Sequence, residues 1–173
     1  MAVGDSGWGS FVDGFLSTWR RVITDPHGFI ADMPLAGGLG HPAAFLVVCA
    51  AVNAAGHLIS GWGIVGLLWV LIAQVIAALL AAVLFVLVAQ HLFNGRAGFE
   101  PTFRVVAYAS APLVFLWVPL VGWLARIYSA YLLVRGLERV QGLDTTRAVL
   151  TMVLGLGALW LLRAVRMGGP AWF

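Results

Sequence analysis

The chain has 173 residues, of which 62% are hydrophobic and only 10% charged, and its formal net charge is +3. Soluble domains carry about 25% charged residues, so this composition excludes an ordinary soluble domain, and it also excludes a disordered chain. A chain this short is expected to form one membrane domain without a sizeable soluble part. We predict an all-α polytopic membrane protein with five transmembrane helices and an amphipathic N-terminal helix lying in the membrane plane.

Residues 1–41 are predicted to form a cytoplasmic N-terminal segment that contains the amphipathic helix. Apolar residues recur there at helical spacing, with polar residues between them: Trp8, Phe11, Val12, Phe15, Trp19 and Ile23. Aromatic residues on one side and Arg20 on the other suit a helix lying among lipid headgroups. Asp25-Pro26 should end it, because a residue before proline disfavours the helical conformation. Alternatively, the segment only anchors the end of the chain.

Five apolar runs follow and are predicted to span the membrane within a domain over 42–165, before a short far-side tail at 166–173. A span needs about 20 apolar residues to cross a hydrocarbon core of about 30 Å. The five runs are 43–60, 64–92, 104–120, 122–140 and 146–163. Only Val121-Gly122 joins the third run to the fourth, and Pro112 and Pro119 interrupt the third. Both a tight hairpin and a re-entrant or surface-lying element therefore remain open.

All ten basic residues are arginines, and their positions predict the orientation of the chain. With five spans, seven arginines fall on the side of the N-terminus: Arg20, Arg21, Arg96, Arg104, Arg135, Arg139 and Arg147. Arg163 and Arg166 flank the opposite end, with Arg126 one turn inside it. The positive-inside rule then places the N-terminus in the cytoplasm and the C-terminus outside. Arginines placed singly or in pairs at span ends orient helices, so no nucleic-acid partner is expected.

Three blocks of sequence, in order, carry a family resemblance. Residues 19–34 hold a Trp, a Val-Ile-Thr-Asp-Pro turn and Met33-Pro34; residues 94–112 read NGRAGFEPTFRVVAYASAP; residues 117–148 contain Pro119, Gly136-Leu137 and Arg147-Ala148. Over about residues 19–165 the chain resembles the Yip domain family, the Ypt/Rab-interacting membrane proteins. The resemblance implies five spans, a cytoplasmic N-terminus and a short far-side C-terminus.

The same resemblance implies less about function. Eukaryotic members are implicated in vesicle traffic and bind small Rab-type GTPases through their cytoplasmic part. Here arginine replaces lysine throughout, and Ala and Gly are abundant, which is typical of a bacterial protein. A bacterium lacks Rab-driven traffic, so the fold is expected to transfer and the function is not. We expect a bacterial cytoplasmic (inner) membrane protein.

Polar residues inside the predicted spans are the first place to look for function. The candidates are Asn53, His57, Gln74, Tyr108, Ser110, Arg126 and Tyr128. They could line a cavity of a transporter, channel or lipid scramblase, or they could form interhelical hydrogen bonds worth about 0.6 to 2 kcal/mol each. No acidic residue lies in the middle of a span, which argues against a carboxylate proton relay.

A second candidate surface lies on the cytoplasmic face, where basic residues adjoin the in-plane helix. Each basic residue near an anionic membrane contributes about 1 kcal/mol of attraction. The residues predicted to contact lipids or a protein partner are Trp19, Arg20, Arg21, Asp25, Pro26, Arg96, Arg104, Arg139 and Arg147. Ordinary orientation of the helices is the alternative. Helix faces of small residues allow close packing, within the bundle or in a homo-oligomer.

No motif of a catalytic nucleophile, metalloprotease or P-loop is present, so we do not expect an enzyme. His27, His41 and His91 project to the cytoplasmic border near carboxylates, but no pair has metal-ligand spacing, and we expect neither a metal nor another cofactor. The sequence favours a non-enzymatic membrane organiser or adaptor that engages lipids or an unidentified protein. The alternative is a transporter, channel or scramblase.

Overall fold

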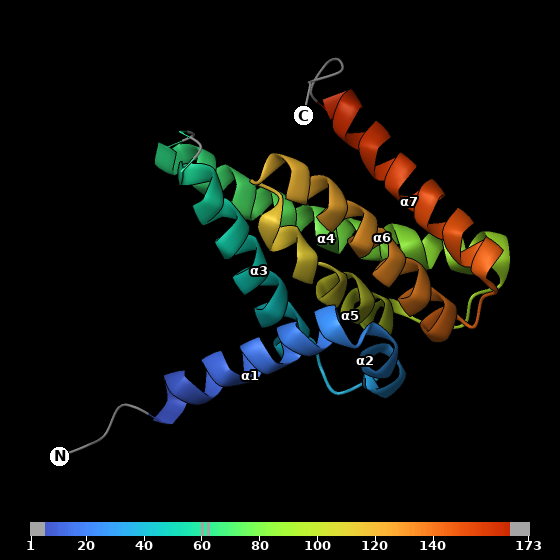
Figure 1. Cartoon of the computed structure of the whole chain (residues 1–173). Helices are drawn as coiled ribbons and strands as arrows, with labels where there is room; N and C mark the ends of the chain where they lie inside the picture. Colours follow the sequence, from blue (N-terminus) through green and yellow to red (C-terminus); the bar gives the residue numbers. More distant parts are fainter. Residues whose placement is uncertain (1–5, 60, 62, 167–173) are drawn as a thin grey trace.

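The computed structural model describes residues 6–59, 61 and 63–166, and Figure 1 shows their helices as a bundle with the two N-terminal helices packed across one end. The tail predicted at 166–173 lies outside the described residues, except for the backbone of Arg166. The described residues contain no strand. The elements are α1 (Ser6–Thr24), α2 (Pro26–Asp32), α3 (Gly40–Ile59), α4 (Gly63–Phe93), α5 (Phe99–Ala109), the 3₁₀ helix η1 (Ala111–Phe115), α6 (Pro119–Gln141) and α7 (Thr145–Arg166).

Three of these helices are long and apolar enough to cross a membrane: α3, α4 and residues Thr145–Leu162 of α7. They correspond to the first, second and fifth predicted spans. The 31 residues of α4 give it a length of about 46 Å, so it exceeds the hydrocarbon core and must tilt or project from it.

The third predicted span is not one helix, and this corrects the sequence-based boundaries. α5 ends at Ala109 and η1 follows, because Pro112 has no backbone N–H to continue the α-helical hydrogen bonds. The turn predicted at Val121-Gly122 is also wrong. The connection lies at residues 116–118, and Pro119 begins α6, since proline suits the first position of a helix.

α5 packs among α3, α4 and α6, at the end of the bundle next to α1 and α2 (Figure 1). Every residue from Thr102 to Ala107 is buried. A Cβ added to Gly136 of α6 would lie 2.3 Å from a Val105 methyl group, so α5 and α6 approach closely where α6 has no side chain. Likewise, a Cβ on Gly155 of α7 would lie 2.4 Å from the ring of Phe85, so this small residue packs within the bundle.

The N-terminal helices α1 and α2 pack against the end of the bundle at which α3 begins (Figure 1). As predicted, α1 ends before Asp25-Pro26. The Asp25 carboxylate accepts a hydrogen bond of 3.0 Å from the Gly28 backbone N–H, which caps α2. Val22 and Met33 are both buried in the hydrophobic core. The N-terminal segment is therefore part of the folded domain rather than an appendage to it.

Candidate functional site

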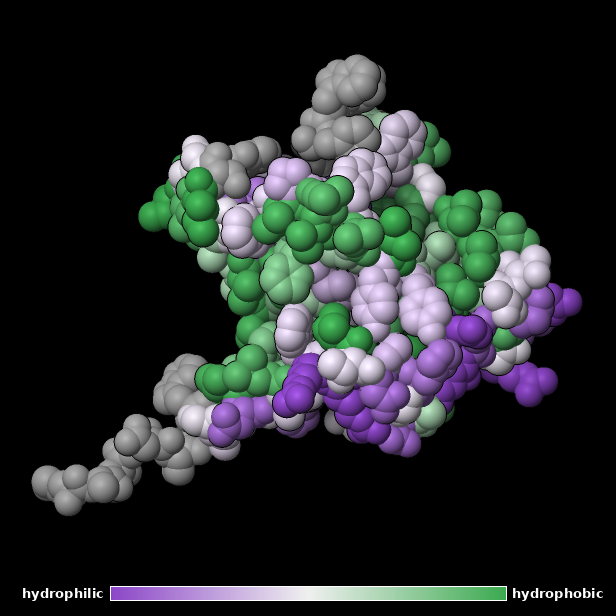
Figure 2. Space-filling view, viewed as in Figure 1, coloured by the Kyte–Doolittle hydropathy of each residue, from purple (hydrophilic) through white to green (hydrophobic). Residues whose placement is uncertain are grey.

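Hydrogen bonds gather the N-terminal segment and two loops at one end of the bundle. The Arg104 guanidinium donates to the Gly38 carbonyl (2.7 Å), and Arg139 donates to the Met33 carbonyl (3.1 Å). The Arg96 backbone N–H donates to the Gln141 carbonyl (3.3 Å). We call this region, formed by residues 26–39, 94–104 and 135–147, the polar end. Figure 2 shows hydrophilic surface along this lower end and hydrophobic surface above it.

The arginines predicted to face lipid, which lie at the polar end or on α1 beside it, fall into two groups. Arg21 pairs with Asp32, and Arg147 pairs with Asp144, yet all four side chains remain largely exposed. Arg20, Arg96 and Arg139 are exposed residues too.

Arg104 differs, because its side chain is only 4% exposed. Its guanidinium lies 3.0 Å from a Glu100 carboxylate oxygen, which also accepts a 2.8 Å hydrogen bond from the Gly38 N–H. These two hydrogen bonds lower the pKa of Glu100 below its ordinary value, the Arg104 side chain being the larger cause.

The structure places Trp19 against protein rather than lipid. Its indole Nε1 donates to the Ala111 carbonyl at 2.9 Å, and its ring meets that of Phe115 edge to face. Asp25 and Pro26 serve the junction between α1 and α2. A strip on α1 stays exposed, formed by Phe11, Val12 and Leu16, and we call it the apolar strip. Because α1 is fixed at its C-terminal half, this strip has a defined position beside the polar end.

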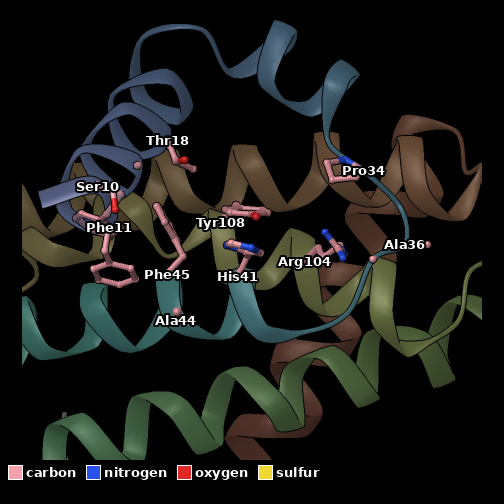
Figure 3. A pocket seen from close by; sticks show the side chains of 13 residues that line it. Ser10, Phe11, Thr18, Pro34, Ala36, His41, Ala44, Phe45, Arg104 and Tyr108 are labelled. Atoms are coloured by element: carbon pink, nitrogen blue, oxygen red, sulfur yellow. The ribbon is translucent and has the colours of Figure 1, made fainter. Parts of the chain in front are cut away.

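A groove of about 430 Å³ separates α1 from the start of α3 and from α5. Its walls include the aromatic rings of Phe11, Phe15, Phe45 and Tyr108, and Arg104 and His41 also line it (Figure 3). Sequence reasoning had missed this groove. The one local signal for it is the spacing of Arg104 and Tyr108, which lie four residues apart and so on one face of a helix, but this spacing does not show what lies opposite.

Two of the predicted intramembrane polar residues meet. The Asn53 side-chain NH₂ donates to the Gln74 side-chain carbonyl at 2.9 Å and so joins α3 to α4. The Asn53 Oδ1 and the Gln74 Nε2 are buried and have no hydrogen-bond partner. His57 lies one turn further along α3 and is half-buried. The pair is thus only half satisfied, which is costly away from water.

The remaining polar candidates make separate contacts. Ser110 donates to the Ala107 carbonyl (2.6 Å), and the Tyr128 hydroxyl donates to the Ile23 carbonyl (2.9 Å), which holds the end of α1 on α6. The ring of Tyr108 packs against Phe29 and Phe45, with centroids 5.0 and 5.2 Å away. Arg126 is exposed and lies over the ring of Trp123.

The three histidines considered as metal ligands lie on three different helices. His27 contacts the Tyr131 hydroxyl (2.8 Å), His91 contacts the Leu87 carbonyl (2.9 Å), and His41 lines the groove. Within the described ranges, no three His, Cys, Asp or Glu side chains form a group that could hold a metal ion.

Apolar helices long enough to cross a membrane, with a polar end built from loops, define an all-helical membrane protein. The model of the Yip1 domain matches residues 20–165, and the chain belongs to this family. The resemblance predicted from the three sequence blocks is thereby confirmed. No curated protein and no solved structure matches the chain.

Proposed function

We propose that this chain is a non-enzymatic membrane organiser or adaptor whose polar end engages the lipid surface and protein partners assembled on it. The proposal rests on how α1 is attached to the bundle. Trp19, Val22 and Tyr128 fix its C-terminal half to the bundle, while the apolar strip is left uncovered, with Val12 48% and Leu16 52% exposed. An apolar strip beside exposed arginines is the arrangement by which a helix lies in a membrane surface.

The proposal includes five crossings, by α3, α4, α5 with η1, α6 and α7, in a bacterial cytoplasmic membrane with the N-terminus inside. α5 rises about 16 Å and η1 adds about 10 Å, so the third crossing needs both elements and also the connection at residues 116–118 to span about 30 Å. The connection between α5 with η1 and α6 lies near the far end of α3, where Trp117 contacts Gly56, and this supports the topology.

Labelling with a membrane-impermeant maleimide on whole cells tests the orientation. Leu120→Cys, at the start of α6, should react from outside, and Asp144→Cys, at the polar end, should not. The native Cys49 is fully buried and serves as the unlabelled background. Labelling of Asp144→Cys from outside would overturn the proposed orientation.

Photo-crosslinking in native membranes tests the engagement itself. A photoreactive amino acid at Leu16 should give lipid adducts, or an adduct with one protein, whereas one at the neighbouring exposed Ser17, about 100° further around α1, should give far fewer. Val12→Glu should reduce the Leu16 adducts. Equal yields at the two positions would contradict the proposal. Deleting residues 1–34 is a poorer test, because it also removes Val22 and Met33 from the core.

A second candidate function, transport or lipid scrambling, is favoured by one observation: the unpaired Asn53 Oδ1 and Gln74 Nε2 between α3 and α4. Such groups could bind a polar species that crosses the membrane. Liposomes containing the purified protein and a fluorescent phospholipid, bleached from outside, measure scrambling. The double variant Asn53→Leu/Gln74→Leu should lose the activity and keep the fold. Absence of scrambling by the unaltered protein would remove the case for scrambling.

A further inference from the structure

The groove between α1, α3 and α5 is lined by both aromatic and basic side chains. Its outer wall is aromatic, from Phe11 and Phe15 of α1 and Phe45 of α3. Next to it lie the guanidinium of Arg104 and the imidazole of His41, both shown between α3 and the chain at residues 34–36 in Figure 3. A ligand that fills the groove must therefore carry an apolar part and an acceptor for hydrogen bonds.

Arg104 is the unusual member of this lining. The residue as a whole is only 3% exposed. Its Nε is buried without a hydrogen-bond partner, although Nη2 donates to the Gly38 carbonyl and to the Glu100 carboxylate. Burying a donor of a charged group without an acceptor is unfavourable by more than an ordinary lost hydrogen bond. An oxyanion in the groove would place negative charge beside this incompletely satisfied guanidinium.

The charges around the groove favour an anion. None of the described side chains that line it is acidic, and the carboxylate beside Arg104, that of Glu100, is already engaged by Gly38 and Arg104. The N-terminus of α3, a helix of 20 residues that begins at Gly40, lies at the groove through His41 and Ala44. Pro42 has no backbone N–H and the Ala43 N–H already donates to the Leu39 carbonyl, so the attraction for an anion comes mainly from the helix dipole, which is positive at this end.

The position of the groove identifies the source of the anion. In Figure 2 the side of the α1 region that faces the bundle is hydrophobic, and hydrophilic surface lies below it, so the groove stands where the membrane surface is expected. A soluble phosphate has no apolar part that could pack against the three phenylalanine rings. In a membrane phospholipid the phosphate is joined through glycerol to acyl chains, and these apolar chains can pack against such rings.

We infer that the groove binds one anionic glycerophospholipid, with the phosphate beside Arg104 and His41 and the start of the acyl chains against Phe11, Phe15 and Phe45. This inference rests on the proposed function and names the lipid class that the polar end takes. A bound lipid fills the gap between α1 and α3 and so stabilises α1 in the membrane surface.

Native mass spectrometry of the full chain in a mild detergent, titrated with phosphatidylglycerol or phosphatidylcholine, tests the inference. We expect tighter binding of phosphatidylglycerol and a loss of about tenfold in Arg104→Gln, since a hydrogen bond to a charged group contributes about 1.5 to 3 kcal/mol. Arg126→Gln, at an exposed arginine of α6 outside the polar end, is the matched control and should bind normally.

Arg104→Gln also removes a contact to Gly38, so a second variant separates binding from folding. Ala44→Leu fills the groove from α3 without touching the hydrogen bonds of Arg104, and it should reduce lipid binding while the unfolding temperature of the lipid-free protein is kept. Competition with inorganic phosphate distinguishes the two sources of phosphate: displacement of the lipid at equal concentration would overturn the lipid assignment.

Equal binding of both lipids, or unchanged binding in both groove variants, would overturn the inference. The photo-crosslinking at Leu16 is independent of the groove. If Leu16 still reacts with lipid while the groove variants bind normally, only the groove assignment fails. If Leu16 gives no adducts, the proposed function fails as well.

Discussion

α4 and α5 are neighbours in the sequence but differ in how far each is buried within the bundle. α4 has the most apolar window of the candidate spans, with a mean hydropathy of 3.0, and only 17% of that window is buried within the protein. α5 is an 11-residue helix whose stretch from Thr102 to Ala107 is buried throughout. In this protein, then, the most apolar helix is largely exposed, whereas the buried helix combines apolar residues with the polar Thr102 and Arg104.

The two helices are also held by different interactions. α4 packs inward through a stripe of four residues, Ala81, Ala82, Phe85 and Ala89. α5 depends on specific hydrogen bonds near its start, where Thr102 donates to the Gly98 carbonyl (2.9 Å) and accepts from the buried Gln141 amide (2.9 Å). We therefore expect substitutions at these two kinds of contact to lower the free energy of unfolding by different amounts.

The largest effect is expected on the inward stripe of α4. Phe85→Ala should lower the free energy of unfolding by about 3 to 5 kcal/mol, because a fully buried ring leaves a cavity. Leu80→Ala, on the exposed side of the same helix, should have little effect, since lipid or detergent replaces the lost contacts. Denaturant unfolding in detergent measures both. Similar losses would show that the exposed side of α4 is covered in the assembled protein.

The next largest effect concerns the close approach of α5 to α6. Gly136→Ala should cost about 1 to 3 kcal/mol through overpacking, because the new methyl group would collide with Val105. Gly157→Ala, where nothing lies within 4 Å of the added Cβ, should be neutral or slightly stabilising. The same unfolding experiment compares them. A stable Gly136→Ala variant would mean that α5 can shift away from α6.

A smaller loss of stability is expected from replacing the buried side-chain amide of Gln141, and almost none from replacing the exposed amide of Gln90. Gln141 is 1% exposed and bonds both the Ala97 N–H (3.0 Å) and Thr102. Gln141→Met should cost on the order of 1 kcal/mol and speed hydrogen exchange at residues 95–102. Gln90→Met removes an exposed hydrogen bond to the same Ala97 and is the control. Equal exchange in the two variants would contradict a clamping role for Gln141.

The smallest effect is a dependence on pH at Glu100. Its pKa is lower in the folded protein than its ordinary value, because Arg104 and the Gly38 N–H stabilise the carboxylate. The resulting stabilisation is fully present above the ordinary pKa of 4.5 and is lost as the pH falls through the lowered value. Glu100→Gln should flatten this part of the profile of unfolding temperature against pH, and Asp144→Asn should leave it unchanged.

Local patterns predicted a large part of this fold. Hydropathy located α3, α4 and α7 to within a few residues, and Asp25-Pro26 marked the end of α1. The two prolines were recognised as interruptions of the third run, but its bounds were misplaced, because hydropathy does not show that α5 ends before Pro112 or that Pro119 begins α6.

The candidate sites were less predictable. Asn53 and Gln74 were both singled out, but nothing in their spacing paired them. Trp19 looked suited to a lipid surface, yet its partner is a carbonyl 92 residues away.

The sequence by itself determined the membrane class, the positions of the long apolar helices and the family, because these depend on composition, on runs of about 20 apolar residues and on ordered motifs. Only the tertiary structure decided that α5 is buried among the other helices, that Arg104 is buried beside a groove and that α1 is fixed by Trp19 and Tyr128. Such contacts join residues far apart in the chain, and their geometry follows from the packing of whole helices rather than from any local pattern.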